Sequence, residues 1–346
     1  MIDLSQTTST AQAVQTVLTD PGISWIKKHT VAIDAPPDSE IDPAPQAQWP
    51  TDAVRTGIYG AVSPRVVTLP DDSYRMYYTQ ILPRPGFPAG ANDYDNSTTR
   101  ILSALSTDGT TWIPEPGVRL SPEEGGANGL RVVSSDVVPR PDGGLRMYYE
   151  CCSEPQRETS PIHSALSDDG LLWTPEAGER LGGPSRGYSS PRAVLLGDGR
   201  YRLYCGERDR GIISALSEDG GTTFCEEPGV RIAPGGTYDT ATAFASEIVH
   251  LNGGGYLMYY AGYSTLNRAY ILRALSDDGL TWRKETAPVI APDKSRWDAA
   301  KCSEMCIFRL PYREAQAPRY GMVYEGCDGT TKNERGVWRV AQATSA

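Results

Sequence analysis

The sequence predicts an all-β protein, and within that class a five-bladed β-propeller with four-stranded antiparallel blades. Three observations lead to this prediction: one hairpin phrase recurs along the chain, a second phrase precedes each copy, and the composition suits short strands joined by turns. The 346 residues include 35 Gly, 27 Pro and 19 Tyr but only 4 Phe. Such a mixture favours strands and turns over a helical bundle.

The first repeated phrase ends a strand, turns at Asp-Gly and restarts at an aromatic residue. Its copies read SALSTDGTTW (103–112), SALSDDGLLW (164–173), SALSEDGGTTF (214–224) and RALSDDGLTW (273–282). Asp-Gly between two strand-like runs is a hairpin signal, because Asp caps the turn and Gly accepts a positive φ. We interpret the phrase as structural and predict that its aromatic residue packs in the core.

The second phrase is strand, turn, strand, and four copies align without a gap. They read SPRVVTLPDDSYRMYY (63–78), SSDVVPRPDGGLRMYY (134–149), SPRAVLLGDGRYRLYC (190–205) and ASEIVHLNGGGYLMYY (245–260), and a degenerate fifth copy covers 302–324. Together with the hairpin phrase, each unit holds four strands and recurs about every 55–70 residues, which is typical of propeller blades.

The fifth unit supplies only three strands, and the last is VWRVAQATS at 337–345. The missing strand is predicted at the other end of the chain, where DPGISW at 20–25 matches the hairpin phrase. We therefore expect an N-terminal strand to complete the last blade and close the ring. Residues 1–19 form an N-terminal extension in this scheme, and 20–346 form a single propeller domain.

Charge and composition limit the classes of partner that the protein is expected to bind. The formal net charge of −10 disfavours nucleic acid as a partner. No apolar run approaches the ~18 residues of a membrane span. The first 20 residues have neither a basic start nor an apolar stretch, so we expect no signal peptide. Seven cysteines, with Cys151 and Cys152 adjacent, indicate a reducing, cytoplasmic location. The expected partner is a small-molecule substrate, and the oligomeric state stays open.

The repeated Y-R-M-Y-Y followed by A-L-S-x-D-G-x-x-W resembles the five-bladed propeller glycosidases, glycoside hydrolase families 43 and 32 and their relatives. The resemblance covers residues 20–346. It implies the propeller fold and an enzyme that acts on a glycoside or a sugar-like small molecule. Members of that clan usually carry a catalytic Asp in a D-P-x-V phrase at the start of an inner strand. In this sequence Ser63, Ser134 and Ser190 take that place, so the resemblance implies a rewired centre.

Two positions further along the same alignment, every inner strand carries an ionisable residue. These residues are Arg65, Asp136, Arg192, Glu247 and, by its shared Ser-Glu, Glu304. Alternation along a strand places them all on the face of the central channel. One interpretation is a structural ring of salt bridges that plugs the channel.

The other interpretation is catalytic. Glu247 and Glu304 are neighbours of like charge, and such a pair raises the pKa of one member and makes a proton donor. We predict that Glu247 or Glu304 is the general acid and that Asp136 orients the two arginines.

Further candidates lie at the channel mouth, where the second strands end and the first strands begin. Substrate-binding residues are predicted to be Arg65, Arg192, Glu150, Glu207, Glu325, Tyr59, Tyr188 and Tyr263. The alternative is that the acids are solvated loop residues and that the aromatics pack between blades. A long insertion at 79–100, rich in Pro, Gly, Asn and Asp, is predicted to act as a lid.

No cofactor or metal is expected. The cysteine spacing fits no zinc pattern. Asp136, Glu247 and Glu304 could bind Ca²⁺, but the two arginines predicted at the same level argue against it. Two rival functions stay open. The scaffold could serve non-hydrolytic acid/base chemistry, such as that of a lyase, isomerase or cyclase in a biosynthetic pathway, or it could bind a ligand without catalysis.

Overall fold

The computed structural model describes residues 17–84, 97–126, 130–153, 160–183, 186–207, 209–311, 319–330 and 336–346. Every regular element in these ranges is a β-strand, so the all-β prediction is confirmed. Accordingly, none of these ranges contains a helix with the length and apolarity that crossing a membrane would need. The predicted extension at 1–19 and the predicted lid at 79–100 fall largely outside the described residues.

Most strands belong to five antiparallel groups, which we number 1 to 5 in chain order. Group 1 holds β3 (Gly60–Thr68), β4 (Tyr74–Pro83), β5 (Ser97–Ser106) and β6 (Ile113–Pro114). Group 2 holds β7 (Arg131–Pro139), β8 (Leu145–Cys152), β9 (Ile162–Ser167) and β10 (Thr174–Pro175). Group 3 holds β11 (Tyr188–Leu195), β12 (Tyr201–Glu207), β13 (Gly211–Ser217) and β14 (Cys225–Glu226).

Group 4 holds β15 (Thr242–Leu251), β16 (Tyr256–Thr265), β17 (Arg268–Ser276) and β18 (Arg283–Lys284). Group 5 holds β19 (Lys301–Arg309), β20 (Tyr320–Cys327) and β21 (Trp338–Ser345), and β2 (Trp25–Lys27) pairs with β21. The remaining strand, β1 (Val17–Leu18), pairs in parallel with the end of β15.

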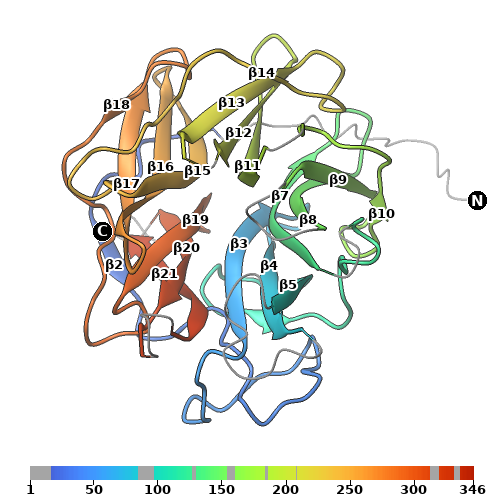
Figure 1. Cartoon of the computed structure of the whole chain (residues 1–346), viewed down its shortest axis with the longest axis vertical. Helices are drawn as coiled ribbons and strands as arrows, with labels where there is room; N and C mark the ends of the chain where they lie inside the picture. Colours follow the sequence, from blue (N-terminus) through green and yellow to red (C-terminus); the bar gives the residue numbers. More distant parts are fainter. Residues whose placement is uncertain are drawn as a thin grey trace, which may run out of the picture.

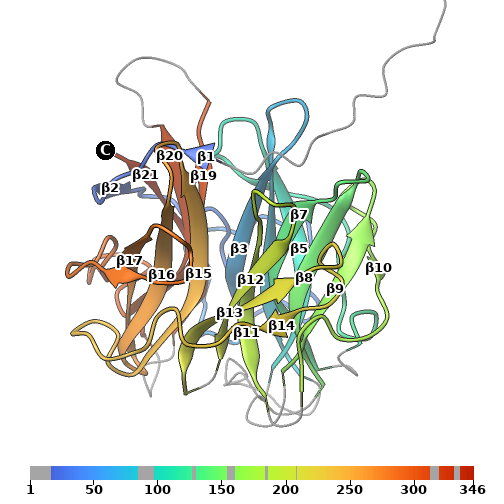
Figure 2. The same cartoon turned by 90° about the horizontal axis from the view of Figure 1, so that it is seen from above.

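The five groups are arranged around a common centre, with their first strands innermost (Figure 1). Each of β3, β7, β11, β15 and β19 contacts the first strand of the next group, and β19 contacts β3. Seen from the side, these strands run roughly along one axis (Figure 2). The starts of the first strands and the ends of the second strands therefore meet at one end of the axis, which we call the mouth.

The N-terminal strand β2 occupies the place in group 5 that β18 occupies in group 4. Lys27 of β2 forms an ion pair with the fully buried Asp298, which precedes β19. In group 4, Lys284 of β18 pairs in the same way with Asp239, which precedes β15. Trp25, like the aromatic of the hairpin phrase, packs edge-on against a tyrosine of the neighbouring group. β2 and β21, which are far apart in the sequence, are thus held in one sheet.

The hairpin phrase builds the turn that its residues predict. In its first copy, the Gly109 N–H donates to Ser106 Oγ at 2.9 Å, and Asp108 Oδ1 accepts the N–H groups of Thr110 and Thr111 at 2.8 and 2.7 Å. Burial opposes ionisation of Asp108, but these donors outweigh it and lower the pKa to about 2. The phrase is a turn cap, as its structural interpretation requires.

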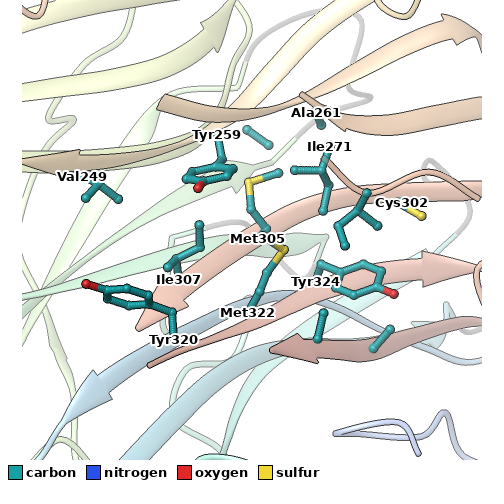
Figure 3. Packing of buried hydrophobic residues seen from close by; sticks show 14 of the residues in the cluster. Val249, Tyr259, Ala261, Ile271, Cys302, Met305, Ile307, Tyr320, Met322 and Tyr324 are labelled. Atoms are coloured by element: carbon teal, nitrogen blue, oxygen red, sulfur yellow. The ribbon is translucent and has the colours of Figure 1, made fainter. Parts of the chain in front are cut away.

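Hydrophobic side chains fill the space between neighbouring groups. Figure 3 shows one such cluster, in which Tyr259 and Ile271 of group 4 lie near Met305, Ile307 and Met322 of group 5. The aromatic residue of the hairpin phrase adds to this packing, since the Trp173 and Tyr77 rings meet edge to face at 5.7 Å. This packing holds the inner strands in fixed positions around the axis.

Candidate functional site

The first four inner strands share an irregularity near the mouth. Each pairing register shifts where two residues of the inner strand oppose one of its partner, as in a β-bulge. At each shift a non-glycine residue has positive φ, namely Ser63 (52°), Ser134 (54°), Ser190 (51°) and Ala245 (54°). Such backbone is uncommon and persists only where its surroundings enforce it. These residues line a small cavity on the axis.

The fifth inner strand has a different register from the one that its sequence suggests. In β3, Arg65 pairs with Tyr77 of the Y-R-M-Y-Y phrase. In β19, the residue opposite the equivalent Val323 is Cys306. Cys306 therefore stands where Arg65, Asp136, Arg192 and Glu247 stand in the other groups, and Glu304 stands at the level of Ser63. The alignment on the shared Ser-Glu is wrong by two residues, because Ser303 lies opposite Glu325 as Val62 lies opposite Thr79, and the Ser-Glu of β19 therefore starts two residues earlier than that of β15.

Four charged side chains form a closed ring across the channel. Arg65 Nε lies 2.8 Å from Asp136 Oδ1, and Arg65 Nη1 lies 2.9 Å from Glu247 Oε2. Arg192 contacts the same two carboxylates, with Nη1 at 2.7 Å from Asp136 Oδ1 and Nε at 2.9 Å from Glu247 Oε2. Cys306 fills the fifth position with its Sγ at 3.4 Å from Arg65 Nη1. Two cations and two anions alternate around the ring, so their formal charges sum to zero.

The ring favours the charged forms of Asp136 and Arg65. Burial by itself would raise the pKa of Asp136, but Arg65 and Arg192 outweigh it and hold that pKa below its usual value. Burial likewise opposes the charge of Arg65, yet Asp136 and Glu247 raise its pKa. Each carboxylate faces two arginines at hydrogen-bond distance. This geometry suits a structural plug better than a proton donor.

A second pair of carboxyl groups lies nearer the mouth. Glu325, in β20, accepts the Ser63 N–H at 2.8 Å on Oε1 and the Ser303 hydroxyl at 2.6 Å on Oε2. Glu304 accepts hydroxyl hydrogen bonds from Ser134, at 3.1 Å, and from Ser190. Ser63 Oγ links the two glutamates, since it lies 3.2 Å from Glu325 Oε1 and 3.1 Å from the hydroxyl of Ser134. We call these two glutamates and four serines the axial cluster.

The surroundings of Glu325 favour its protonated form. Burial and the charge of Glu304 raise the pKa of Glu325 well above its usual value, and the donors Ser303 and Ser63 only partly offset this rise. Of the predicted acids, Glu304 and Glu325 are therefore the two that the structure brings together around one group of serines.

The cavity beside the axial cluster is narrow. Ser63, Ser134, Ser190, Glu304 and Arg192 line it, and its volume is about 10 Å³, on the order of one water molecule. The cavity has room for a water molecule but not for a six-membered ring. A larger cavity of about 660 Å³ lies elsewhere, between β2 and the segment 289–296, and contains no member of the cluster.

Tyr263 lies beside the axial cluster, and Glu150 has a partner within its own group. The Tyr263 phenol is hydrogen-bonded to Ser303, and burial raises its pKa. Its ring also faces the Lys301 ammonium, with 5.8 Å between Nζ and the centroid. Glu150 is buried and accepts the Ser160 hydroxyl at 2.9 Å.

The other predicted mouth residues have separate partners. Tyr59 is buried and its hydroxyl donates to the Glu40 carbonyl. Tyr188 is also buried, and burial raises its pKa to about 12. Glu207 is paired with Arg186 and Arg210. In the described ranges, no three His, Cys, Asp or Glu side chains converge in a way that would hold a metal ion.

No family model matches the sequence, and no curated protein matches it. Solved structures do share its fold. A putative glycosidase from Bacteroides thetaiotaomicron has a TM-score of 0.63 and 18% identity, covering 93% of this chain and 97% of its own. A second similar structure comes from work on the GH130 family of mannoside phosphorylases, which contains glycoside hydrolases that target β-1,2 mannosidic linkages in Candida mannan. It has a TM-score of 0.67 and 16% identity, and the match covers 95% of this chain and 96% of that one.

A thermostable family-43 glycoside hydrolase is also similar, with a TM-score of 0.61, 16% identity, and coverage of 83% of this chain and 90% of that one. The chain therefore has the propeller-like fold found among glycoside hydrolases. At these identities the likeness defines the fold, and the chemistry must be argued from the residues at the mouth.

Proposed function

We propose that this protein is an enzyme acting on a carbohydrate or a sugar-like small molecule, with acid/base chemistry at the mouth of its central channel. The observation that carries the proposal is the buried pair of Glu304 and Glu325, which the hydroxyl groups of Ser63 and Ser134 link near the mouth. In this proposal the five groups are the five blades of one ring, closed by the pairing of β2 with β21. A cytoplasmic location would suit a small substrate.

The axial cluster assigns different tasks to its two acids. The proton is assigned to Glu325, because burial beside Glu304 disfavours its ionised form. Glu304 serves as the base, and its charge is stabilised by the hydroxyl donors Ser134 and Ser190. A substrate oxygen that reaches the pair meets an acid and a base on the same side, as general acid–base catalysis requires.

The arrangement of the pair favours a second candidate, which is non-hydrolytic. Glu304 and Glu325 share one set of serine hydroxyl groups, because Ser63 contacts Glu325 and Ser134, and Ser134 donates to Glu304. A lyase, isomerase or cyclase that moves a proton on one face of its substrate fits this arrangement, in which both acids belong to one cluster.

The test is turnover on a panel of aryl glycosides and of free sugars that can isomerise or eliminate water. Glu304→Gln and Glu325→Gln preserve shape and remove the titrating proton, so each should lower turnover about 10²–10⁴-fold. Glu115→Gln is the matched control, because Glu115 is a buried carboxylate that pairs with Arg75 away from the mouth. Near-parent turnover of both cluster variants between about pH 5 and about pH 8 would remove the pair from the mechanism. Saturable binding without any turnover would favour a non-catalytic protein.

A further inference from the structure

Two arginines hold one buried glutamate at the mouth edge of group 3. Arg186 precedes β11, Arg210 lies in the connection between β12 and β13, and Glu207 ends β12 with only 6% of its side chain exposed. Arg186 Nη1 contacts Glu207 Oε1, and Arg210 Nη1 contacts Oε2. Arg210 Nη1 also donates to Glu226 Oε1 at 2.7 Å. The two arginine side chains remain 43% and 34% exposed.

These two arginines use their donors unlike the other arginines in the protein. Arg75 and Arg202 each grip a glutamate with the Nε and Nη2 atoms of one guanidinium edge. A paired Nε–Nη2 edge is the usual way in which an arginine holds a carboxylate. By contrast, Arg186 and Arg210 contact their acids only through Nη1. Their Nε–Nη2 edges are therefore not taken up by the acids that hold them.

The position of the arginines connects them with the axial cluster. Glu207 pairs across the sheet with Tyr188, and Ser190, two residues further along β11, donates to Glu304. The four residues from Arg186 to Ser190 cover about 13 Å at about 3.3 Å per residue. One end of a sugar-sized molecule can therefore contact the cluster while a substituent reaches the arginine edges.

We propose that Arg186 and Arg210 form a carboxylate-binding subsite and that the substrate is an acidic sugar or a similar carboxylic acid. The proposal rests on the proposed function, because the subsite is useful only if the axial cluster is the reaction centre. Glu207 and Glu226 fix the guanidinium groups and offset their charge. Recognition therefore comes from directed N–H donors matched to a planar carboxylate, and an anion without that geometry gains less.

The test is direct binding, by isothermal titration calorimetry and by NMR, of D-glucuronate, D-glucose and inorganic phosphate. D-glucuronate should bind saturably and at least about tenfold more tightly than D-glucose, which corresponds to one lost charge-assisted contact. Arg186→Gln and Arg210→Gln should each weaken glucuronate binding about tenfold or more. Arg186→Lys and Arg210→Lys, which keep the charge and lose the planar edge, should weaken it as well.

Arg200→Gln is the matched control. Arg200 belongs to the same group, is 42% exposed, and already uses its Nε and Nη2 on Asp198 at the β11–β12 turn. This variant should bind glucuronate as the parent does. Equal affinity for glucose and glucuronate, or tighter binding of phosphate than of glucuronate, would overturn the subsite. A different result would overturn the proposed function without overturning the subsite: Glu325→Gln that keeps full turnover and still binds glucuronate.

Discussion

Removing Arg65 should show how strongly the charged ring holds the channel together. Arg65 contacts both Asp136 and Glu247, so Arg65→Ala leaves these two carboxylates with Arg192 as their only ring cation. Asp136 is completely buried and cannot gain water in exchange. Breaking a buried ion pair by removing one partner costs about 3–5 kcal/mol of the free energy of unfolding.

The same cost can be expressed as a change in melting temperature. An unfolding entropy of about 2.1 cal/mol/K per residue gives about 0.7 kcal/mol/K for a chain of this length. Arg65→Ala should therefore lower the melting temperature by about 4–7 °C, measured by differential scanning calorimetry near pH 7. Arg200→Ala, which removes an exposed pair with Asp198, should leave the melting temperature nearly unchanged.

The pH dependence provides an independent check. The pKa of Asp136 is lowered in the folded protein by Arg65 and Arg192, against burial. A lowered carboxyl pKa contributes stability above the unfolded value of about 3.9 and loses it as the pH falls through the folded value. The difference in melting temperature between the parent and Arg65→Ala should thus be largest near neutral pH and should decrease below about pH 4. An unchanged melting temperature at pH 7, or a difference that grows in acid, would refute the ring as a stabilising element.

Three further predictions follow from other parts of the structure. Deleting residues 1–34 removes β2 and Lys27, exposes the β21 edge and leaves Asp298 without its cation, and it should therefore unfold the protein. Cooperative melting of the truncated protein at the parent temperature would contradict closure through β2. The pKa of Glu325 is raised in the folded protein, so ionisation of this carboxyl group destabilises the fold as the pH rises. Glu325→Gln should therefore have a higher melting temperature than the parent above neutral pH and the same melting temperature near pH 4. Ser303→Ala removes a donor to Glu325 and should raise that pKa further in a ¹³C NMR titration, with Ser303→Thr restoring it.

The repeated phrases made the strands of groups 1 to 4 predictable, because strand, turn and core aromatic recur in a fixed order. The bulges were not predictable in the same way. A positive φ at Ser63 or Ser134 depends on contacts from other groups, such as the Glu325 side chain that accepts the Ser63 N–H. Sequence reasoning therefore found the serines at the axis and missed what they bind.

The carboxyl pair was missed for a more specific reason. The two residues Ser-Glu occur in both the fourth and the fifth inner strands, and aligning on them placed Glu304 in the ring. The signal that gives the correct register is the apolar end of the strand, where residues 307–310 (IFRL) correspond to residues 66–69 (VVTL). That match places Cys306 beside Arg65, as the structure does, and brings Glu304 to the serine level near Glu325.

The pairing of β2 with β21 also limits when the protein can finish folding. Gln342 donates to the Thr30 backbone across 312 residues of sequence, and such non-local contacts slow folding because a long loop must close first. During synthesis β2 leaves the ribosome long before its partner strand β21. We expect residues 17–33 to stay without their final partner until β21 has been made. In that interval their apolar side chains are available to chaperones and to nascent copies of the same chain.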